Sequence, residues 1–181
     1  MKKKVFFDKT ERSQNLIKDS YERDVLGLLG GRGSVGGLFG YEFVKTPKKG
    51  TDVNLLITWC TDEDISEMAG DLKGYSVAIL NSRNPGKIYL NIDNWKSLRE
   101  PHHSAWIKEY GRKNALKKYR KYVVNHEFGH VLGAEHDDFV VPVSEGGCHL
   151  MEQQTFMPKR RCKPSSKIHK KTRKILKGWD F

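Results

Sequence analysis

Apolar and polar positions form blocks whose spacing predicts a strand and a helix at the start of the chain. The apolar run at Lys4–Phe7 predicts a short first strand. Apolar residues then recur every three or four positions over residues 10–29, behind a capping-box pattern that starts at Asp8. We therefore expect one amphipathic helix over residues 10–29, ended by the glycine pair that begins at Gly30.

Glycine dominates the next segment, because residues 27–40 contain seven glycines. Gly31–Gly36 fits G-x-G-x-x-G, a pattern that binds a dinucleotide when a strand precedes it and a helix follows. Here a predicted helix precedes the pattern, and Leu38–Val44 after it reads as a strand. The context therefore favours a flexible turn or strand entry over a nucleotide site.

Strands are predicted to dominate the middle of the chain. Val53–Trp59 predicts a buried strand, and the acidic residues 62–71 predict one short helix. Tyr75–Leu80 and Lys87–Ile92 predict two further strands, joined across an Asn-Pro-Gly turn signal at residues 84–86. Lys87–Ile92 or its hairpin partner is expected at the sheet edge, where it could bind an extended peptide by strand addition.

A long helix is predicted after a connecting loop over residues 95–106. Apolar and histidine side chains recur down one side from about residue 112 to residue 132, the range expected for this helix. The predicted fold class is α+β, with a twisted mixed sheet packed on this helix. We expect residues 1–162 to form a single domain and residues 163–181 to form a basic tail. Residues at helical spacing predict a terminal helix in that tail: Ile168, Thr172, Ile175 or Leu176, and Trp179.

Charge is distributed unevenly along the chain. A length of 181 residues with 37% hydrophobic residues suits one domain with a core, and no apolar run is long enough for a membrane span. The apolar run near the start stops at Asp8, so we expect no cleaved signal peptide, and the compartment stays open. The formal charge is +11, and residues 159–178 carry ten basic side chains and no acidic one. Such a tail can bind nucleic acid or an anionic surface, or it can be a solvated tail that aids solubility.

A metal-binding pattern occupies residues 126–136, which match H-E-x-x-H-x-x-G-x-x-H without a gap. His126 and His130 stand four residues apart, so on a helix they share one face and can reach one metal ion. Gly133 can adopt the left-handed conformation that ends a helix, which lets His136 approach the metal from outside it. Three protein ligands with one open position are typical of catalytic zinc.

Glu127 is the expected general base, because it follows the first histidine and can face a water on the metal. Zinc lowers the pKa of its bound water to about 7 and polarises a scissile carbonyl. We therefore predict one catalytic Zn²⁺, no further cofactor, and a zinc-dependent endopeptidase acting on proteins or peptides. The alternatives are a zinc hydrolase of non-peptide amides, and a basic nucleic-acid- or surface-binding protein with a non-catalytic zinc. In the latter case Cys148 could be a fourth ligand, although this is less favoured.

From the histidines onward the chain resembles the metzincin metallopeptidases. Met151 follows His136 by fifteen residues, and in metzincins a turn carrying a methionine forms a hydrophobic floor beneath the three histidines. Gln153 stands where some metzincins have a tyrosine that touches the metal, so that tyrosine is not carried over. A closer resemblance, over residues 87–164, is to a poorly characterised, mainly bacterial metzincin-like family.

Three stretches carry that closer resemblance: V-V-N-H-E-F-G-H at residues 123–130, M-E-Q-Q-T at residues 151–155, and C-K-P at residues 162–164. The resemblance implies a minimal metzincin (zincin-like) fold with a small C-terminal Met-turn subdomain, and dependence on zinc. It also implies a disulfide between Cys148 and Cys162 that pins the methionine turn, which requires an oxidising compartment or a local oxidant. It implies no substrate class.

The remaining polar candidates have no ligand spacing. Asp137 either orients the third histidine or belongs to a turn. Four histidines are expected at the surface: His102, His103, His149 and His169.

Overall fold

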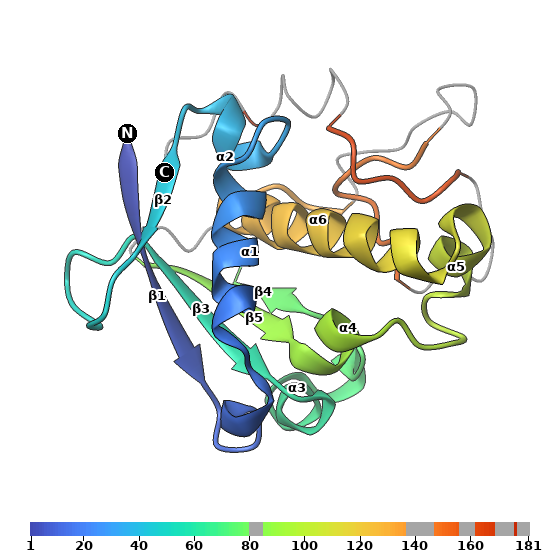
Figure 1. Ribbon diagram of the computed structural model, residues 1–181, viewed down its shortest axis with the longest axis horizontal. Helices are drawn as coiled ribbons and strands as arrows, with labels where there is room; N and C mark the ends of the chain where they lie inside the picture. The colour runs from blue at the N-terminus through green and yellow to red at the C-terminus, as the bar shows by residue number, and fades with distance from the viewer. Residues whose placement is uncertain (80–84, 137–146, 156–161, 169–175, 177–181) are drawn as a thin grey trace.

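A five-stranded mixed sheet forms the centre of the protein in the computed structural model, which describes residues 1–79, 85–136, 147–155, 162–168 and 176 (Figure 1). The strand order is β2-β1-β3-β5-β4. Strands β2, β1, β3 and β5 run parallel, and β4 is an antiparallel edge strand on β5. The strands are β1 (Lys2–Lys9), β2 (Glu42–Lys45), β3 (Leu55–Cys60), β4 (Val77–Ala78) and β5 (Gly86–Asn91). This mixed α/β architecture is consistent with the predicted α+β class.

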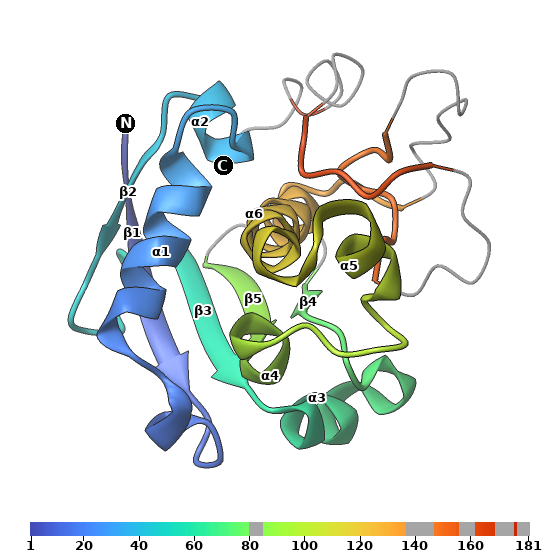
Figure 2. The same ribbon diagram turned by 45° about the vertical axis from the view of Figure 1, so that its right-hand side comes forward.

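The two main helices, α1 and α6, lie side by side over one face of the sheet (Figures 1 and 2). The helices are α1 (Asp19–Gly30), α2 (Val35–Leu38), α3 (Asp62–Ala69), α4 (Ile92–Lys96), α5 (Ser104–Tyr110) and α6 (Arg112–Val131), with 3-10 turns η1 (Gln14–Leu16) and η2 (Gly70–Leu72). Within the described ranges, none of these helices has the length and apolarity that crossing a bilayer requires.

The core lies between the sheet and the helices. Alternate side chains of the three central strands are buried there, as expected for a sheet covered on one face: Val5, Phe7, Leu55, Ile57, Trp59, Ile88 and Leu90. Helix α6 fills the other side of this core with large side chains: Tyr119, Tyr122, Val123 and Phe128. Ile168 and Leu176 of the C-terminal segment are buried in the same core, and most of the predicted terminal helix lies outside the described residues.

The predicted helix over residues 10–29 is wrong in its first half, because α1 begins only at Asp19. The backbone N–H of Thr10 and the hydroxyl of Ser13 both donate to the carbonyl of Trp59, at 3.1 Å and 2.8 Å. These bonds hold the chain against the end of β3, so tertiary contacts override helical propensity there. Asp8, the predicted cap, lies within β1.

Two further predictions need correction, and a third, which left either hairpin strand open as the sheet edge, is decided in favour of the partner of Lys87–Ile92. The glycine-rich segment contains the short helix α2, so the strand predicted from Leu38 begins only at Glu42. The loop predicted over residues 95–106 contains the end of α4 and the start of α5. Of the two hairpin strands, β5 pairs with β3 and is interior, so β4 is the edge strand. The turn between them lies partly outside the described residues.

Candidate metal centre

Three imidazole rings converge at the end of α6. His126 and His130 lie one turn apart on this helix, and Gly133 then takes a φ of 100° that turns the chain back. His136 follows this turn. The Nε2 atoms of His126 and His130 are 3.2 Å apart, and the Nε2 atom of His136 lies 3.1 Å and 3.0 Å from them. The structure thus brings together all three histidines singled out in the sequence.

Backbone carbonyls fix the tautomer of two of these rings. The Nδ1 atom of His126 lies 2.7 Å from the carbonyl of Leu150, and that of His130 lies 2.7 Å from the carbonyl of Ala134. A carbonyl oxygen only accepts, so each Nδ1 carries the hydrogen and each neutral ring presents an Nε2 lone pair. Lone pairs this close repel one another unless a cation lies among them.

The triangle of nitrogens fits a tetrahedral metal ion. Zinc–nitrogen bonds of about 2.0–2.1 Å place two ligands of a tetrahedron roughly 3.3 Å apart, close to the observed separations of 3.0–3.2 Å. Burial lowers the pKa of His130 to about 4 and the pKa of His126 well below its usual range, and the neighbouring imidazoles lower both further. Metal ligands must be neutral imidazoles, so this electrostatic environment suits the role.

Glu127 lies beside the three rings, at the wall of a cavity of about 410 Å³. Burial raises the pKa of its carboxyl well above the usual range, while the backbone N–H of Ala78 in β4 hydrogen-bonds to it and opposes that rise. Helix α6 and the edge strand therefore meet at this carboxylate. The residues lining the cavity are Leu72, Tyr75, Ser76, Val77, Ala78, His126, Glu127, His130, Glu135, His136 and Gln153.

Met151 lies directly beneath α6 and is fully buried. A Cβ atom placed on Gly129 would lie 2.4 Å from its Sδ atom and 3.0 Å from its Cε atom. Gly129 stands between the first two histidines, so only the missing side chain lets the methionine sulfur approach the helix there. The V-V-N-H-E-F-G-H stretch contains Gly129, but the sequence does not show why glycine is needed there. The structural reason is the contact with Met151, which lies 22 positions further along the chain.

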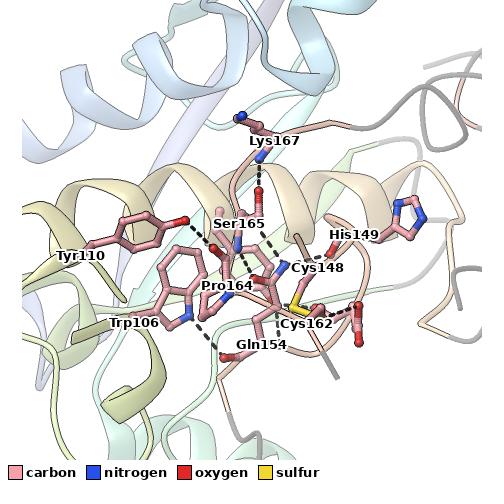
Figure 3. The surroundings of a disulfide bond; sticks show 11 residues. Trp106, Tyr110, Cys148, His149, Gln154, Cys162, Pro164, Ser165 and Lys167 are labelled. Atoms are coloured by element: carbon pink, nitrogen blue, oxygen red, sulfur yellow. Dashed lines mark hydrogen bonds between the residues drawn. A yellow bond between two sulfur atoms is a disulfide. The ribbon is translucent and has the colours of Figure 1, made fainter. Parts of the chain in front are cut away.

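A disulfide joins Cys148 and Cys162 and holds the segment that carries Met151 (Figure 3). The buried side chain of Gln154 reinforces it: its Nε2 donates to the carbonyls of His149 (2.8 Å) and Ser165 (3.1 Å), and its Oε1 accepts from the Ser165 N–H (2.8 Å). The Leu150 carbonyl that orients His126 belongs to this same segment. The disulfide and Gln154 therefore position the ring of His126 indirectly.

Asn125 ties α6 to the glycine-rich segment on the far side of the helix. It is 1% exposed, and its Oδ1 accepts from the backbone N–H of Val35 at 2.6 Å. Its Nδ2 donates to the carbonyls of Leu28 (3.1 Å) and Lys121 (2.9 Å). A Cβ at Gly36 would lie 2.4 Å from the ring of Phe43, so packing accounts for glycine there. Sequence reasoning assigned Asn125 no role and interpreted the glycine-rich segment only as a flexible turn or strand entry.

Two of the other histidines are not where the sequence placed them, and His102 is half-buried. His103 is fully buried and His149 is 1% exposed, so their prediction as surface residues was wrong. Burial lowers the pKa of His103 to about 4, and its Nδ1 atom contacts the backbone of Arg99. Neither joins the metal cluster among the described residues. Asp137 and His169 lie outside the described residues.

Part of the chain is similar to a protein family. A family described as "Protein of unknown function (DUF3152)" matches residues 100–170, which include the three histidines and Met151. Among solved structures, one titled "GM1 bound form of the ECX AB5 holotoxin" has 12% identity and a TM-score of 0.45. That match covers 93% of this chain and 65% of the other, so the chain spans less than two thirds of that neighbour. No curated protein matches the sequence.

Proposed function

We propose that this protein is a zinc-dependent peptidase of the metzincin type, in which His126, His130 and His136 hold the ion and Glu127 is the general base. The observation that carries the proposal is the convergence of three Nε2 atoms at 3.0–3.2 Å beside a buried carboxylate. The methionine packed beneath the histidine helix and the mixed sheet over it support the metzincin fold.

A catalytic role is favoured over a purely structural one. Closed structural zinc sites use four protein ligands and often cysteine. Among the described residues, this cluster offers three histidines, and Cys148 is bonded to Cys162 and is no thiolate ligand. The three nitrogens line an open cavity, which leaves room for water and a substrate carbonyl.

Zinc bound by the three histidines supplies Lewis-acid chemistry, because it polarises a carbonyl and lowers the pKa of a coordinated water to about 7. The chain's own contribution is the Glu127 carboxylate, which accepts the proton of the attacking water and then donates it to the leaving amine. Acid–base catalysis of this kind contributes roughly 10²–10⁴-fold. The carbonyls of Leu150 and Ala134 keep two imidazoles oriented throughout.

The edge strand supports a peptide as the substrate. The Ile79 N–H donates to the Lys87 carbonyl at 3.0 Å, and hydrogen-bonded pairs alternate along an antiparallel ladder. The backbone of Ala78 therefore faces away from β5, toward Glu127 and the cavity. An extended peptide aligned on β4 would present its carbonyls at the cavity, as in strand addition.

The test compares wild-type full-length protein with Glu127→Gln, and with Glu63→Gln as a matched control on the exposed surface of α3. We expect about one zinc per chain in all three proteins, measured by elemental analysis. Mass spectrometry of a broad peptide library should show cleavage by the wild type and the control, and a loss of roughly 10²–10⁴-fold in the Glu127 variant.

Two results would contradict the proposal. A wild-type chain that purifies and refolds without binding zinc would remove the metal site. A fully zinc-loaded wild type that cleaves no library peptide would refute the peptidase assignment, and a panel of non-peptide amides would then test the alternative hydrolase.

A further inference from the structure

Positive charge in the body of the protein is concentrated on the first half of α6. Residues 112–121 carry six basic side chains and no acidic one, whereas the rest of residues 1–158 carries 17 basic and 21 acidic side chains. The net charge of residues 1–158 is close to zero, but the positive charge is concentrated in residues 112–121. This stretch belongs to the helix that bears the metal ligands, but it lies before them in the sequence.

The two arginines of this stretch are engaged within the fold. Arg112 donates to the Leu98 carbonyl at 2.9 Å. Arg120 donates to the Trp95 carbonyl at 2.9 Å and 2.6 Å, and its guanidinium lies 4.9 Å from the centre of a Trp95 ring. Both guanidinium groups therefore hold α6 against the segments that precede it in the chain.

The four lysines of this stretch form a surface that we call the lysine face: Lys113, Lys117, Lys118 and Lys121. The first three are exposed and Lys121 is half-buried. Within the described ranges none of the four forms a salt bridge. Lys113, Lys117 and Lys121 are spaced four residues apart, so they share one side of the helix at intervals of about 6 Å.

The basic C-terminal segment begins beside this face. The hydroxyl of Tyr110 donates to the Pro164 carbonyl at 2.6 Å (Figure 3). The ammonium of Lys118 lies 4.7 Å from the centre of the Tyr110 ring. Lys167, close by in the sequence, is exposed. Lys163 of this segment forms a salt bridge with Glu109 at 3.4 Å, whereas the lysine face has no such acidic partner within the described ranges. Like charges held near one another without acidic partners are unfavourable in the free protein. A bound polyanion would relieve that repulsion.

We propose that the lysine face binds the phosphate backbone of a nucleic acid. Lysines about 6 Å apart along a helix form a row of positive charge that can neutralise neighbouring phosphates of one strand, which carries one negative charge per about 3.4 Å of duplex axis. The face has no bidentate arginine or glutamine aimed outward, so it recognises backbone rather than base sequence. The large exposed hydrophobic residues of the described chain lie elsewhere, so it lacks the apolar side chains that insert into a bilayer.

The test is the salt dependence of binding to a fluorescent 20-base-pair DNA duplex, measured by anisotropy with the full chain. The variant Lys113→Gln, Lys117→Gln and Lys121→Gln removes three charges and keeps most of each aliphatic stem. Its matched control, Lys48→Gln, Lys49→Gln and Lys96→Gln, removes three exposed charges elsewhere. Circular dichroism and zinc content check that both variants keep the fold.

Each lysine–phosphate contact adds about 0.9 to the slope of log affinity against log salt. Between 50 and 200 mM salt the wild type should therefore lose about 40-fold more affinity than the lysine-face variant, and the control should behave as the wild type. Equal slopes for all three proteins would overturn the proposal, as would equal weakening of both variants. Binding that depends on the face but occurs only on vesicles with anionic lipid would show that the partner class is wrong.

Discussion

The contact between Gly129 and Met151 can be tested by adding one methyl group. In Gly129→Ala the new Cβ would lie 2.4 Å from the Met151 Sδ atom, well inside the optimal separation of about 3.5–4.0 Å for carbon contacts. Overpacking of this kind costs roughly 1–3 kcal/mol. Alanine gains about 1 kcal/mol over glycine inside a helix. We therefore expect a net loss of about 0–2 kcal/mol in the free energy of unfolding.

Gly27→Ala is the matched control, because Gly27 lies within α1 and nothing lies within 4 Å of a Cβ placed there. It should stabilise the protein by about 0.5–1 kcal/mol, because only the preference of alanine over glycine in a helix then contributes. Urea unfolding of both variants measures the difference, which isolates the steric cost at Gly129. Zinc affinity should fall in Gly129→Ala and stay unchanged in Gly27→Ala, because Met151 adjoins the carbonyl that orients His126.

A double-mutant cycle with Met151→Ala completes the test. The single Met151→Ala change should cost about 2–5 kcal/mol, because it empties a fully buried position. Together with Gly129→Ala it should cost less than the sum by roughly 1–3 kcal/mol, since the clash is gone. Additivity within about 0.5 kcal/mol would refute the argument that the sulfur packs against the helix.

Three other predictions concern buried groups elsewhere in the fold. Asn125→Ala should destabilise the protein by about 2 kcal/mol in urea unfolding, because a buried backbone N–H loses its acceptor; Asn114→Ala, exposed on the same helix, should be neutral or stabilising. Replacing Cys148 and Cys162 by serine should cost about 3 kcal/mol, since the bridge closes a loop of 14 residues, and reductant should then have no further effect. Burial raises the pKa of the Cys60 thiol to about 12, so iodoacetamide at pH 8 should label Cys60 only after unfolding, and rapid labelling of the native protein would contradict its burial.

The sequence predicts the convergence of the three histidines well because the motif is local. His126 and His130 are related by helix geometry alone, and Gly133 supplies the reversal that brings in His136. The long helix and the central strands were predicted for the same reason: their periodicity is strong over many positions.

Features that depend on distant contacts were missed. The hydrogen bonds from Thr10 and Ser13 to Trp59 cross about 50 positions, so no local pattern shows that the first helix starts late. Asn125 and Val35 are 90 residues apart, and helix propensity alone gives no reason for a buried asparagine. His103 was misplaced because a histidine has no hydrophobic signal, although its ring packs against Tyr119.

The carbonyl of Leu150, which accepts from the His126 ring, also sets the order in which the site can be completed during protein synthesis. All three histidines are made before Leu150 and Met151 and also emerge from the ribosomal exit tunnel before them, because translation runs from the N-terminus. At that stage the helix offers ligands whose first ring is not yet oriented. On the proposed function, strong metal capture therefore waits for the docking of the C-terminal segment, so a chain released before Leu150 is made carries the full histidine motif without the carbonyl that orients His126.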